Sequence, residues 1–282
     1  MAEQNIAILG GKGMLGSDLA ELACNRQFST SVLDLLEFDI TDHSQLETAI
    51  AASDVIINCA AYTNVDGAES EYEQAYAVNA EAVGNLGKIA NQTGKYVIHL
   101  STDFIFDGTL DRPYVETDIP NPINAYGKSK LVGEQLLQQS GCDHCIIRIQ
   151  WTYGLHGNNF VAKLLSKARP GQTLKVVDDQ VGCPTATTEV ARIICSLPAR
   201  RPKGIFHFAS AEYASRFDMA KFILEKKQIP AELIPCKTSD FPSPAKRPLN
   251  SRFNCGKIQP LLDEPIKPWQ QPLEQFLKKL PS

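Results

Sequence analysis

Short apolar runs alternate with amphipathic segments along most of this 282-residue chain. The apolar runs predict buried strands at residues 5–9, 30–34, 54–58, 95–100 and 145–149, and one further strand at 204–209. Helical patterns are found at residues 14–25, 43–52, 71–92, 124–139 and 186–196. Alternation of strands and helices is typical of an α/β fold with a doubly wound parallel sheet and right-handed crossovers.

The pattern changes after about residue 150, where recurrent prolines break the chain into short pieces. This predicts a smaller C-terminal lobe over the carboxyl edge of the sheet, where ligands bind in such folds. We expect residues 1–150, with roughly 186–212, to form the sheet domain, and residues 151–185 and 213–282 to form the lobe.

Composition excludes several classes of protein. The net charge of −4 comes without a basic run, so no nucleic-acid partner is expected. No apolar stretch is long enough to cross a membrane, and no signal peptide precedes the first strand. We therefore expect a cytoplasmic monomer or homodimer with eight reduced cysteines. Cys142, His144 and Cys145 resemble half a metal site, but they lack a second pair at suitable spacing, so no metal is predicted.

A glycine-rich turn follows the first predicted strand. Gly10, Gly13 and Gly16 stand between this strand and the first predicted helix. Glycines at these positions allow a tight turn and close backbone approach, and they leave a helix N-terminus free to hold a pyrophosphate. A glycine triplet alone is weak evidence, but its place between a strand and a helix is what a dinucleotide site requires. The pattern therefore predicts a Rossmann-type domain that binds a dinucleotide.

The second predicted strand ends at Asp34. A carboxylate at this position accepts hydrogen bonds from the adenosine ribose and repels a 2′-phosphate. Residues 35–38 supply no Arg or Lys for such a phosphate, which favours NADH over NADPH. Lys12 and Arg26 could fold over the site, so both cofactors stay open.

Tyr126 and Lys130 are four residues apart in a predicted helix, and so they share one face. We expect the ammonium to lower the pKa of the phenol and give a usable general acid. Thr102 follows the strand at 95–100 and could donate a hydrogen bond to a substrate carbonyl beside this phenol. Ser101, Thr102 and Asp103 could instead only cap a turn, but the order of glycines, threonine, tyrosine and lysine favours catalysis.

These motifs resemble those of extended short-chain dehydrogenases/reductases, and more narrowly those of the dTDP-4-dehydrorhamnose reductases. The resemblance spans nearly the whole chain. It is carried by Asn58-Cys59-Ala60-Ala61-Tyr62-Thr63, Asn64-Val65-Asp66-Gly67-Ala68-Glu69, Ser101-Thr102-Asp103-Phe104-Ile105-Phe106-Asp107-Gly108, Trp151-Thr152-Tyr153-Gly154, Asn158-Asn159-Phe160, Asp179-Gln180-Val181-Gly182-Cys183-Pro184-Thr185 and Arg247-Pro248-Leu249-Asn250-Ser251-Arg252.

The family reduces the C4 ketone of a nucleotide-linked 4-keto-6-deoxy sugar with NADH or NADPH. The resemblance implies that Tyr126 protonates the developing alkoxide, Thr102 holds the carbonyl oxygen and Lys130 binds the nicotinamide ribose. It implies sugar contacts by Asp103, Phe104 and Trp151, with Asn159 and Arg247 near the nucleotide diphosphate. The implied cofactor contacts are Gly10, Gly13, Met14, Leu15, Gly16, Asp34, Asp39, Ala60, Ala61, Tyr62, Asn79, Tyr126 and Lys130.

Two alternatives remain open at this point. Another sugar-nucleotide 4-reductase or an epimerase would reuse the same threonine, tyrosine and lysine, whereas a dehydratase would need a glutamate where Phe104 stands. A regulatory protein similar to the β subunit of methionine adenosyltransferase would not need these residues, and their presence favours catalysis. Some family members bind magnesium through glutamates at a dimer contact. Here Asp18 and Glu189 match but a third carboxylate is not evident, so a metal-linked dimer is not expected.

Overall fold

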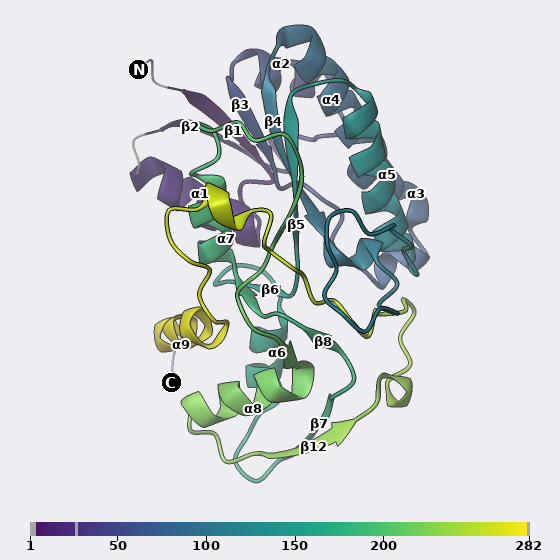
Figure 1. Cartoon of the computed structure of the whole chain (residues 1–282), viewed down its shortest axis with the longest axis vertical. Helices are drawn as coiled ribbons and strands as arrows, with labels where there is room; N and C mark the ends of the chain where they lie inside the picture. Colours follow the sequence, from purple (N-terminus) through teal and green to yellow (C-terminus); the bar gives the residue numbers. More distant parts are fainter. Residues whose placement is uncertain (1–3, 26–27, 281–282) are drawn as a thin grey trace.

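The computed structural model describes residues 4–25 and 28–280, and its central feature is a six-stranded sheet of order β10-β5-β4-β3-β1-β2 (Figure 1). All of its pairings are parallel. The strands are β1 (Asn5–Leu9), β2 (Ser29–Leu33), β3 (Val55–Asn58), β4 (Tyr96–Thr102), β5 (His144–Ile149) and β10 (Gly204–Phe208). The doubly wound parallel sheet is therefore confirmed, and the 204–209 run returns to it as an edge strand.

Helices cover both faces of the sheet (Figure 1). One face packs against α1 (Met14–Asn25) and α7 (Thr187–Ile194). The other packs against α2 (His43–Ala51), α4 (Ala82–Thr93) and α5 (Ala125–Gln139). Along β1, Ile6 and Ile8 join the first core while Ala7 and Leu9 join the second. Successive strand side chains point to opposite faces, so a strand covered on both sides reads as one continuous apolar run.

The predicted helix at 71–92 is divided in the structure. It consists of α3 (Tyr72–Tyr76), a π-helical turn (Ala77–Glu81) and then α4. The π turn carries Asn79, whose amide Nδ2 donates to the carbonyl of Tyr62 at 3.1 Å and to Ser129 Oγ at 3.0 Å. Such turns are frequent at functional sites, and this one joins the loop after β3 to α5.

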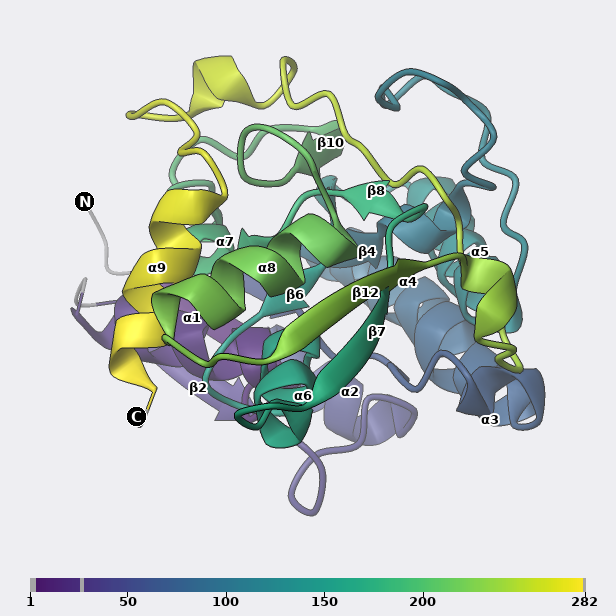
Figure 2. The same ribbon diagram turned by 90° about the horizontal axis from the view of Figure 1, so that it is seen from below.

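The C-terminal half adds short paired strands and three helices around a separate apolar core, which includes Tyr153, Met219 and Trp269. Figure 2 shows α8, β7 and β12 in front of the main sheet. The strands are β6 (Thr152–Tyr153), β7 (Thr173–Val177), β8 (Val181–Gly182), β9 (Thr185–Ala186), β11 (Ala214–Ser215) and β12 (Glu232–Cys236). The helices are α6 (Phe160–Lys167), α8 (Arg216–Lys226) and α9 (Gln270–Lys279).

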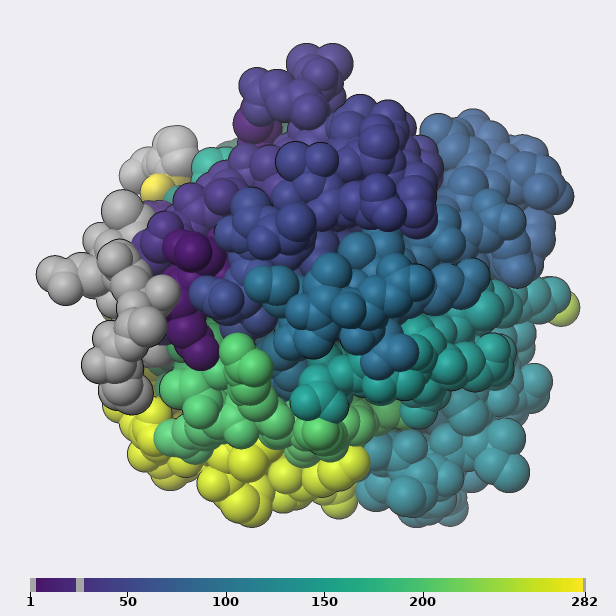
Figure 3. Space-filling view, turned by 90° about the horizontal axis from the view of Figure 1, so that it is seen from above, coloured from purple at the N-terminus to yellow at the C-terminus, as the bar shows by residue number. Residues whose placement is uncertain are grey.

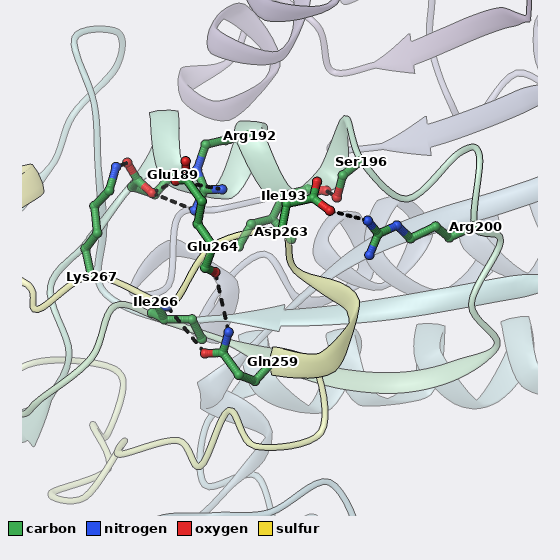
Figure 4. A network of polar contacts seen from close by, with 10 residues as sticks. All are labelled: Glu189, Arg192, Ile193, Ser196, Arg200, Gln259, Asp263, Glu264, Ile266 and Lys267. Carbon is green, nitrogen blue, oxygen red and sulfur yellow. Dashed lines mark hydrogen bonds and ion pairs between the residues drawn. The ribbon is translucent and has the colours of Figure 1, made fainter.

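The chain returns to α7 through residues 259–267, as the stick view shows (Figure 4). Glu189 pairs with Arg192 at 3.1 Å and with Lys267 at 3.0 Å, and Arg192 also lies 3.8 Å from Glu264. Seen from above, green and yellow parts of the chain, from its C-terminal half, line one edge of a face formed mainly by the N-terminal half (Figure 3). Two cations thus neutralise Glu189.

No cluster of three or more His, Cys, Asp or Glu within residues 4–25 and 28–280 is arranged to hold a metal ion.

None of the helices in the described ranges combines the length and the apolar character needed to cross a membrane.

Candidate active site

The β1–α1 turn is tightly packed where the dinucleotide motif was predicted. Gly10 has φ +72°, and a Cβ on it would lie 2.6 Å from the backbone nitrogen of Ala60. A Cβ on Gly16 would lie 2.2 Å from the carbonyl oxygen of Gly10. Both positions therefore require glycine, because a side chain on Gly10 would push the turn away from the loop after β3, and one on Gly16 would push α1 away from the turn. Gly13, Met14 and Leu15 complete this turn, so the predicted loop residues lie together.

Asp34 lies beside this turn, as predicted. Its Oδ2 accepts from the backbone N–H of Lys12 at 2.6 Å, while the Lys12 ammonium pairs with Glu37 at 2.9 Å. Asp39 is different, because its carboxylate caps a local turn by accepting from the N–H of Thr41 at 2.9 Å. No hydrogen bond in the described part of the chain joins Asp39 to the glycine turn. Arg26, which the sequence left as a possible phosphate contact, lies outside the described residues.

The loop after β3 forms the neighbouring wall. Ala60 contacts Gly10 and donates its N–H to Asn58 Oδ1 at 3.1 Å. Two residues further on, the N–H of Tyr62 donates to Asn79 Oδ1 at 2.9 Å. These hydrogen bonds join the loop residues Ala60, Ala61 and Tyr62 to Asn79, and the loop and Asn79 together lie between the glycine turn and α5.

Thr102 and Tyr126 lie together where β4 ends and α5 begins. Thr102 Oγ1 donates to Asp103 Oδ1 and accepts from the N–H of Phe104, both at 3.2 Å. The rings of Phe104 and Tyr126 pack edge to face with centroids 5.8 Å apart. A hydrogen bond between Thr102 and Tyr126 acts to lower the pKa of Tyr126. A threonine hydroxyl and a phenol therefore converge on one point, as the sequence predicted.

The expected effect of Lys130 on Tyr126 is wrong in this structure. Burial dominates and raises the pKa of Tyr126 to about 12, against the hydrogen bond with Thr102. The Lys130 ammonium is directed elsewhere, because its Nζ donates to the carbonyl of Leu100 at 2.8 Å. The phenol consequently holds its proton at neutral pH, which is the form that an acid catalyst needs.

Asp103 is a buried carboxylate beside these groups. Burial raises its pKa to about 6, while hydrogen bonds from Ser251 and Thr102 and the charge of Arg216 act in the opposite direction. The carboxyl of Asp103 therefore changes between its neutral and charged forms close to pH 6.

Trp151 and Arg216 form a stacked pair facing Asp103. Trp151 has φ +46°, a strained backbone for a bulky residue, and a Cβ on Gly182 would lie 2.6 Å from its indole. The guanidinium of Arg216 lies 3.6 Å from the centre of the indole ring. Burial lowers the pKa of Arg216 to about 10, opposed by the charge of Asp103. This guanidinium donates no hydrogen bond to any side chain or carbonyl of the described residues.

Sequence reasoning missed Arg216. The available signal was Ser215, which together with Asp218 forms a capping box at the start of α8. That motif places Arg216 in the first helical turn, but only the fold brings this turn to Trp151.

Two other predicted residues are already engaged within the protein. Arg247 makes a bidentate ion pair with Asp66, at 2.8 and 2.7 Å. Asn159 caps α6 by accepting from the N–H of Ala162 at 3.1 Å, and its amide donates to the carbonyl of Gly154 at 2.9 Å. Arg247 thus joins the loop after β3 to the segment that follows β12.

A parallel dinucleotide-type sheet, with threonine, tyrosine and lysine at its carboxyl edge, defines an oxidoreductase of the extended short-chain dehydrogenase/reductase class. Comparison with known proteins narrows the class. The family model for the RmlD substrate binding domain matches residues 4–282. A protein of Aggregatibacter actinomycetemcomitans named dTDP-4-dehydrorhamnose reductase is 37% identical over 286 residues, covering 96% of this chain and 97% of the relative. The chain therefore belongs to the dTDP-4-dehydrorhamnose reductase family.

Solved structures agree with this assignment. The reductase of Bacillus anthracis in complex with NADP has a TM-score of 0.94 at 31% identity, covering 99% of this chain and 100% of that one. The reductase ortholog of Clostridium acetobutylicum has a TM-score of 0.92 at 34% identity, with coverages of 97% and 98%.

Proposed function

We propose that this protein reduces the C4 ketone of dTDP-4-dehydro-L-rhamnose to give dTDP-L-rhamnose. The observation that carries the proposal is the convergence of Thr102 and Tyr126 at the same edge of the sheet as the β1–α1 turn, in a chain of the reductase family. The turn at Gly10 and Gly16 fits a dinucleotide, because a Cβ at either position would clash with backbone atoms of the protein, and only glycines allow the tight turn that presents the N-terminus of α1 to a pyrophosphate. When bound, the reduced nicotinamide supplies the hydride.

In this mechanism Tyr126 donates its proton to the oxygen that becomes the C4 hydroxyl. Thr102 donates a hydrogen bond to the same oxygen and so stabilises charge that appears only in the transition state. Lys130 would hold the nicotinamide ribose through its ammonium. Because burial keeps Tyr126 protonated, the enzyme is ready to act as an acid at neutral pH.

Arg216 is our candidate for the diphosphate of the substrate. Its guanidinium lies over the ring of Trp151 without a hydrogen-bond acceptor among the described residues, and a planar fork suits phosphate oxygens. Asp103, Phe104 and Trp151 would then contact the hexose. In the conformation described here Arg247 pairs with Asp66, so a diphosphate contact by Arg247 would require that pair to open.

The remaining assignments belong to the same proposal. Residues 1–150 with roughly 186–212 would hold the cofactor, and residues 151–185 and 213–282 would hold the sugar. Asp34, held beside the glycine turn, and the pairing of Lys12 with Glu37 favour NADH. The relative from Bacillus anthracis bound NADP, so both cofactors belong in the test. We place the enzyme in the cytoplasm, with a sugar nucleotide as its partner and a monomer or homodimer as its assembly.

The test is loss of absorbance at 340 nm when the purified protein meets dTDP-4-dehydro-L-rhamnose, with NADH and NADPH compared in parallel. Sugar-dependent oxidation is expected, and the ratio of kcat/KM values ranks the cofactors. Cofactor binding without oxidation would contradict the proposal and favour another sugar nucleotide or a regulatory role.

A further inference from the structure

Three polar side chains form a buried row behind the catalytic tyrosine. They are Asn58 at the end of β3, His99 in β4 and Lys130 in α5, with exposed fractions of 0%, 0% and 2%. Asn58 Nδ2 lies 3.1 Å from His99 Nδ1, and His99 Nε2 lies 3.5 Å from Lys130 Nζ. Neither Asn58 nor His99 was predicted as a site residue.

The hydrogen bonds around Asn58 fix which nitrogen of the ring carries the proton. Asn58 Oδ1 already accepts from the N–H of Ala60 at 3.1 Å, so the amide presents its Nδ2 donor to the ring. His99 Nδ1 must then be an acceptor, because a proton on it would face another donor. A neutral ring consequently carries its proton on Nε2, which points to Lys130.

This arrangement opposes the charged form of Lys130. An ammonium has three donors and no acceptor, so it cannot accept from the Nε2–H of His99. A neutral amine can, because it has a lone pair. The ring therefore favours loss of a proton from Lys130, although the carbonyl of Leu100 accepts from Nζ at 2.8 Å.

The other groups around Lys130 are few. On α5 itself Glu134 raises the pKa of Lys130, and on the β3 side so does Cys59, whose own pKa is raised by burial to about 12. Burial outweighs both and lowers the pKa of Lys130 to about 8. Burial, the charge of Lys130 and the charge of His144 from β5 together hold the pKa of His99 well below its ordinary value, so the ring stays neutral.

We propose that Asn58 and His99 are positioning residues that set the pH at which Lys130 loses its proton, and with it the alkaline limit of the enzyme. The amide fixes the ring tautomer, and the ring presents a donor to the lysine. Only the kinetic readout of this proposal rests on the proposed reductase function. The ring tautomer can be measured whether or not the protein turns over that sugar.

The first experiment is ¹⁵N NMR of the histidine rings in the unmodified protein, which has five histidines. We expect one ring, assigned to His99 by its loss in His99→Gln, to stay neutral from pH 5 to 9 with its proton on Nε2. A proton on Nδ1 would overturn the proposal. If His99→Gln does not fold, the ring can be assigned from its one-bond couplings to the backbone and side chain.

The second experiment replaces Asn58 by Asp, which keeps the acceptor for Ala60 but presents an acceptor to Nδ1. The ring should invert and accept from the Lys130 ammonium through Nε2. The fall of kcat/KM at alkaline pH, expected near pH 8 in the unmodified enzyme, should then move up by about one unit, a tenfold change in proton affinity. The control is Asn254→Asp, which adds the same charge on an exposed loop with no described contact to Asn58, His99 or Lys130.

The two readouts separate the possible results. If the ring of His99 inverts in Asn58→Asp but the alkaline fall of kcat/KM stays at the same pH, the proposal is overturned. It is also overturned if the fall moves although the ring does not invert, because the added charge alone would then explain the change. If Asn58→Asp does not fold, the tautomer in the unmodified protein decides. If no turnover is found, the proposed function fails while the tautomer measurement still tests the Asn58–His99 row.

Discussion

Burial and hydrogen-bond direction, more than residue type, set the chemistry of individual groups in this site. Burial raises the pKa of Tyr126 to about 12 and lowers that of Lys130 to about 8. The tyrosine therefore keeps its proton at neutral pH, whereas the pKa of the lysine lies about one unit above neutral pH. Burial raises the pKa of Asp103 to about 6, so this carboxyl titrates just below neutral pH.

Replacing Tyr126 by Phe removes the proton donor and keeps the ring that packs against Phe104. We expect kcat to fall by about 10²- to 10⁴-fold, the usual contribution of a positioned acid. Cofactor affinity, measured by fluorescence titration, should change little. Unchanged turnover in a folded Tyr126→Phe protein would show that another group supplies the proton.

Replacing Arg216 by Ala removes the cation stacked on Trp151. We expect KM for the sugar nucleotide to rise by about tenfold or more, a loss of about 1.4 kcal/mol or more, while KM for the cofactor stays the same. Arg216→Lys should recover little, because an ammonium lacks the planar fork. An equal rise in KM for the sugar nucleotide and for the cofactor would point to a general structural effect instead.

The grouping of the site residues can be predicted in part from the sequence alone. The order of Gly10, Thr102, Tyr126 and Lys130 was enough to group them, because strand ends and helix starts meet at one edge of such a sheet. Arg216 was missed because stacking on Trp151 depends on contacts between distant segments. The lowered pKa expected for Tyr126 was wrong because spacing in a helix does not tell where an ammonium points.

Among the elements, the start of α5 positions Tyr126, the proposed proton donor. Asn124 Oδ1 accepts from the N–H of Gly127 at 2.7 Å, and its Nδ2 donates to the carbonyl of Lys246 at 2.8 Å. The cap thus joins α5 to the segment after β12, two residues before Tyr126.

Asn124→Ala should lower the free energy of unfolding by about 1 to 3 kcal/mol, through loss of the cap and of the donor to Lys246. It should also lower kcat, because the helix start frays next to Tyr126. Asn124→Asp is the matched comparison, since it keeps the cap and loses only the second bond. Urea unfolding measures both variants, and equal stability of Asn124→Ala and the unmodified protein would contradict this account.

The inner strands β1, β3 and β5 were predicted well because each contains a continuous apolar run that is buried on both faces. The edge strand β2 is mostly exposed and has a weaker apolar pattern. The 71–92 helix was predicted as one piece, since the π turn at Ala77–Glu81 keeps a helical pattern. The pieces after residue 150 could not be assigned in detail. Strands of two residues such as β6 and β8 have no measurable period and are defined by their partners.

At the scale of the whole molecule, a buried ion pair joins three elements. Arg148 in β5 donates to Glu134 of α5, with 2.7 Å between Nη2 and Oε2, and lies 3.3 Å from His207 of β10. Both partners of the pair are almost fully buried. An exchange of this pair for apolar residues keeps the packing, whereas removal of one partner leaves a charge without compensation.

Glu134→Gln should therefore lower the free energy of unfolding by about 3 to 5 kcal/mol. The double variant Glu134→Leu with Arg148→Met should recover most of this loss, because it removes both charges. Denaturant unfolding of the single and double variants measures the difference. A double variant no more stable than Glu134→Gln would show that the pair itself holds these elements together.

Isotope transfer from the cofactor tests whether this chain reduces the sugar at C4. The protein is incubated with dTDP-4-dehydro-L-rhamnose and nicotinamide cofactor deuterated at its C4 position, one face at a time. One of the two labelled forms of the cofactor should transfer its deuterium to C4 of dTDP-L-rhamnose. The label would be seen by NMR and as a mass increase of about one unit. Cofactor oxidation without deuterium in the sugar, or an unchanged sugar, would contradict the account.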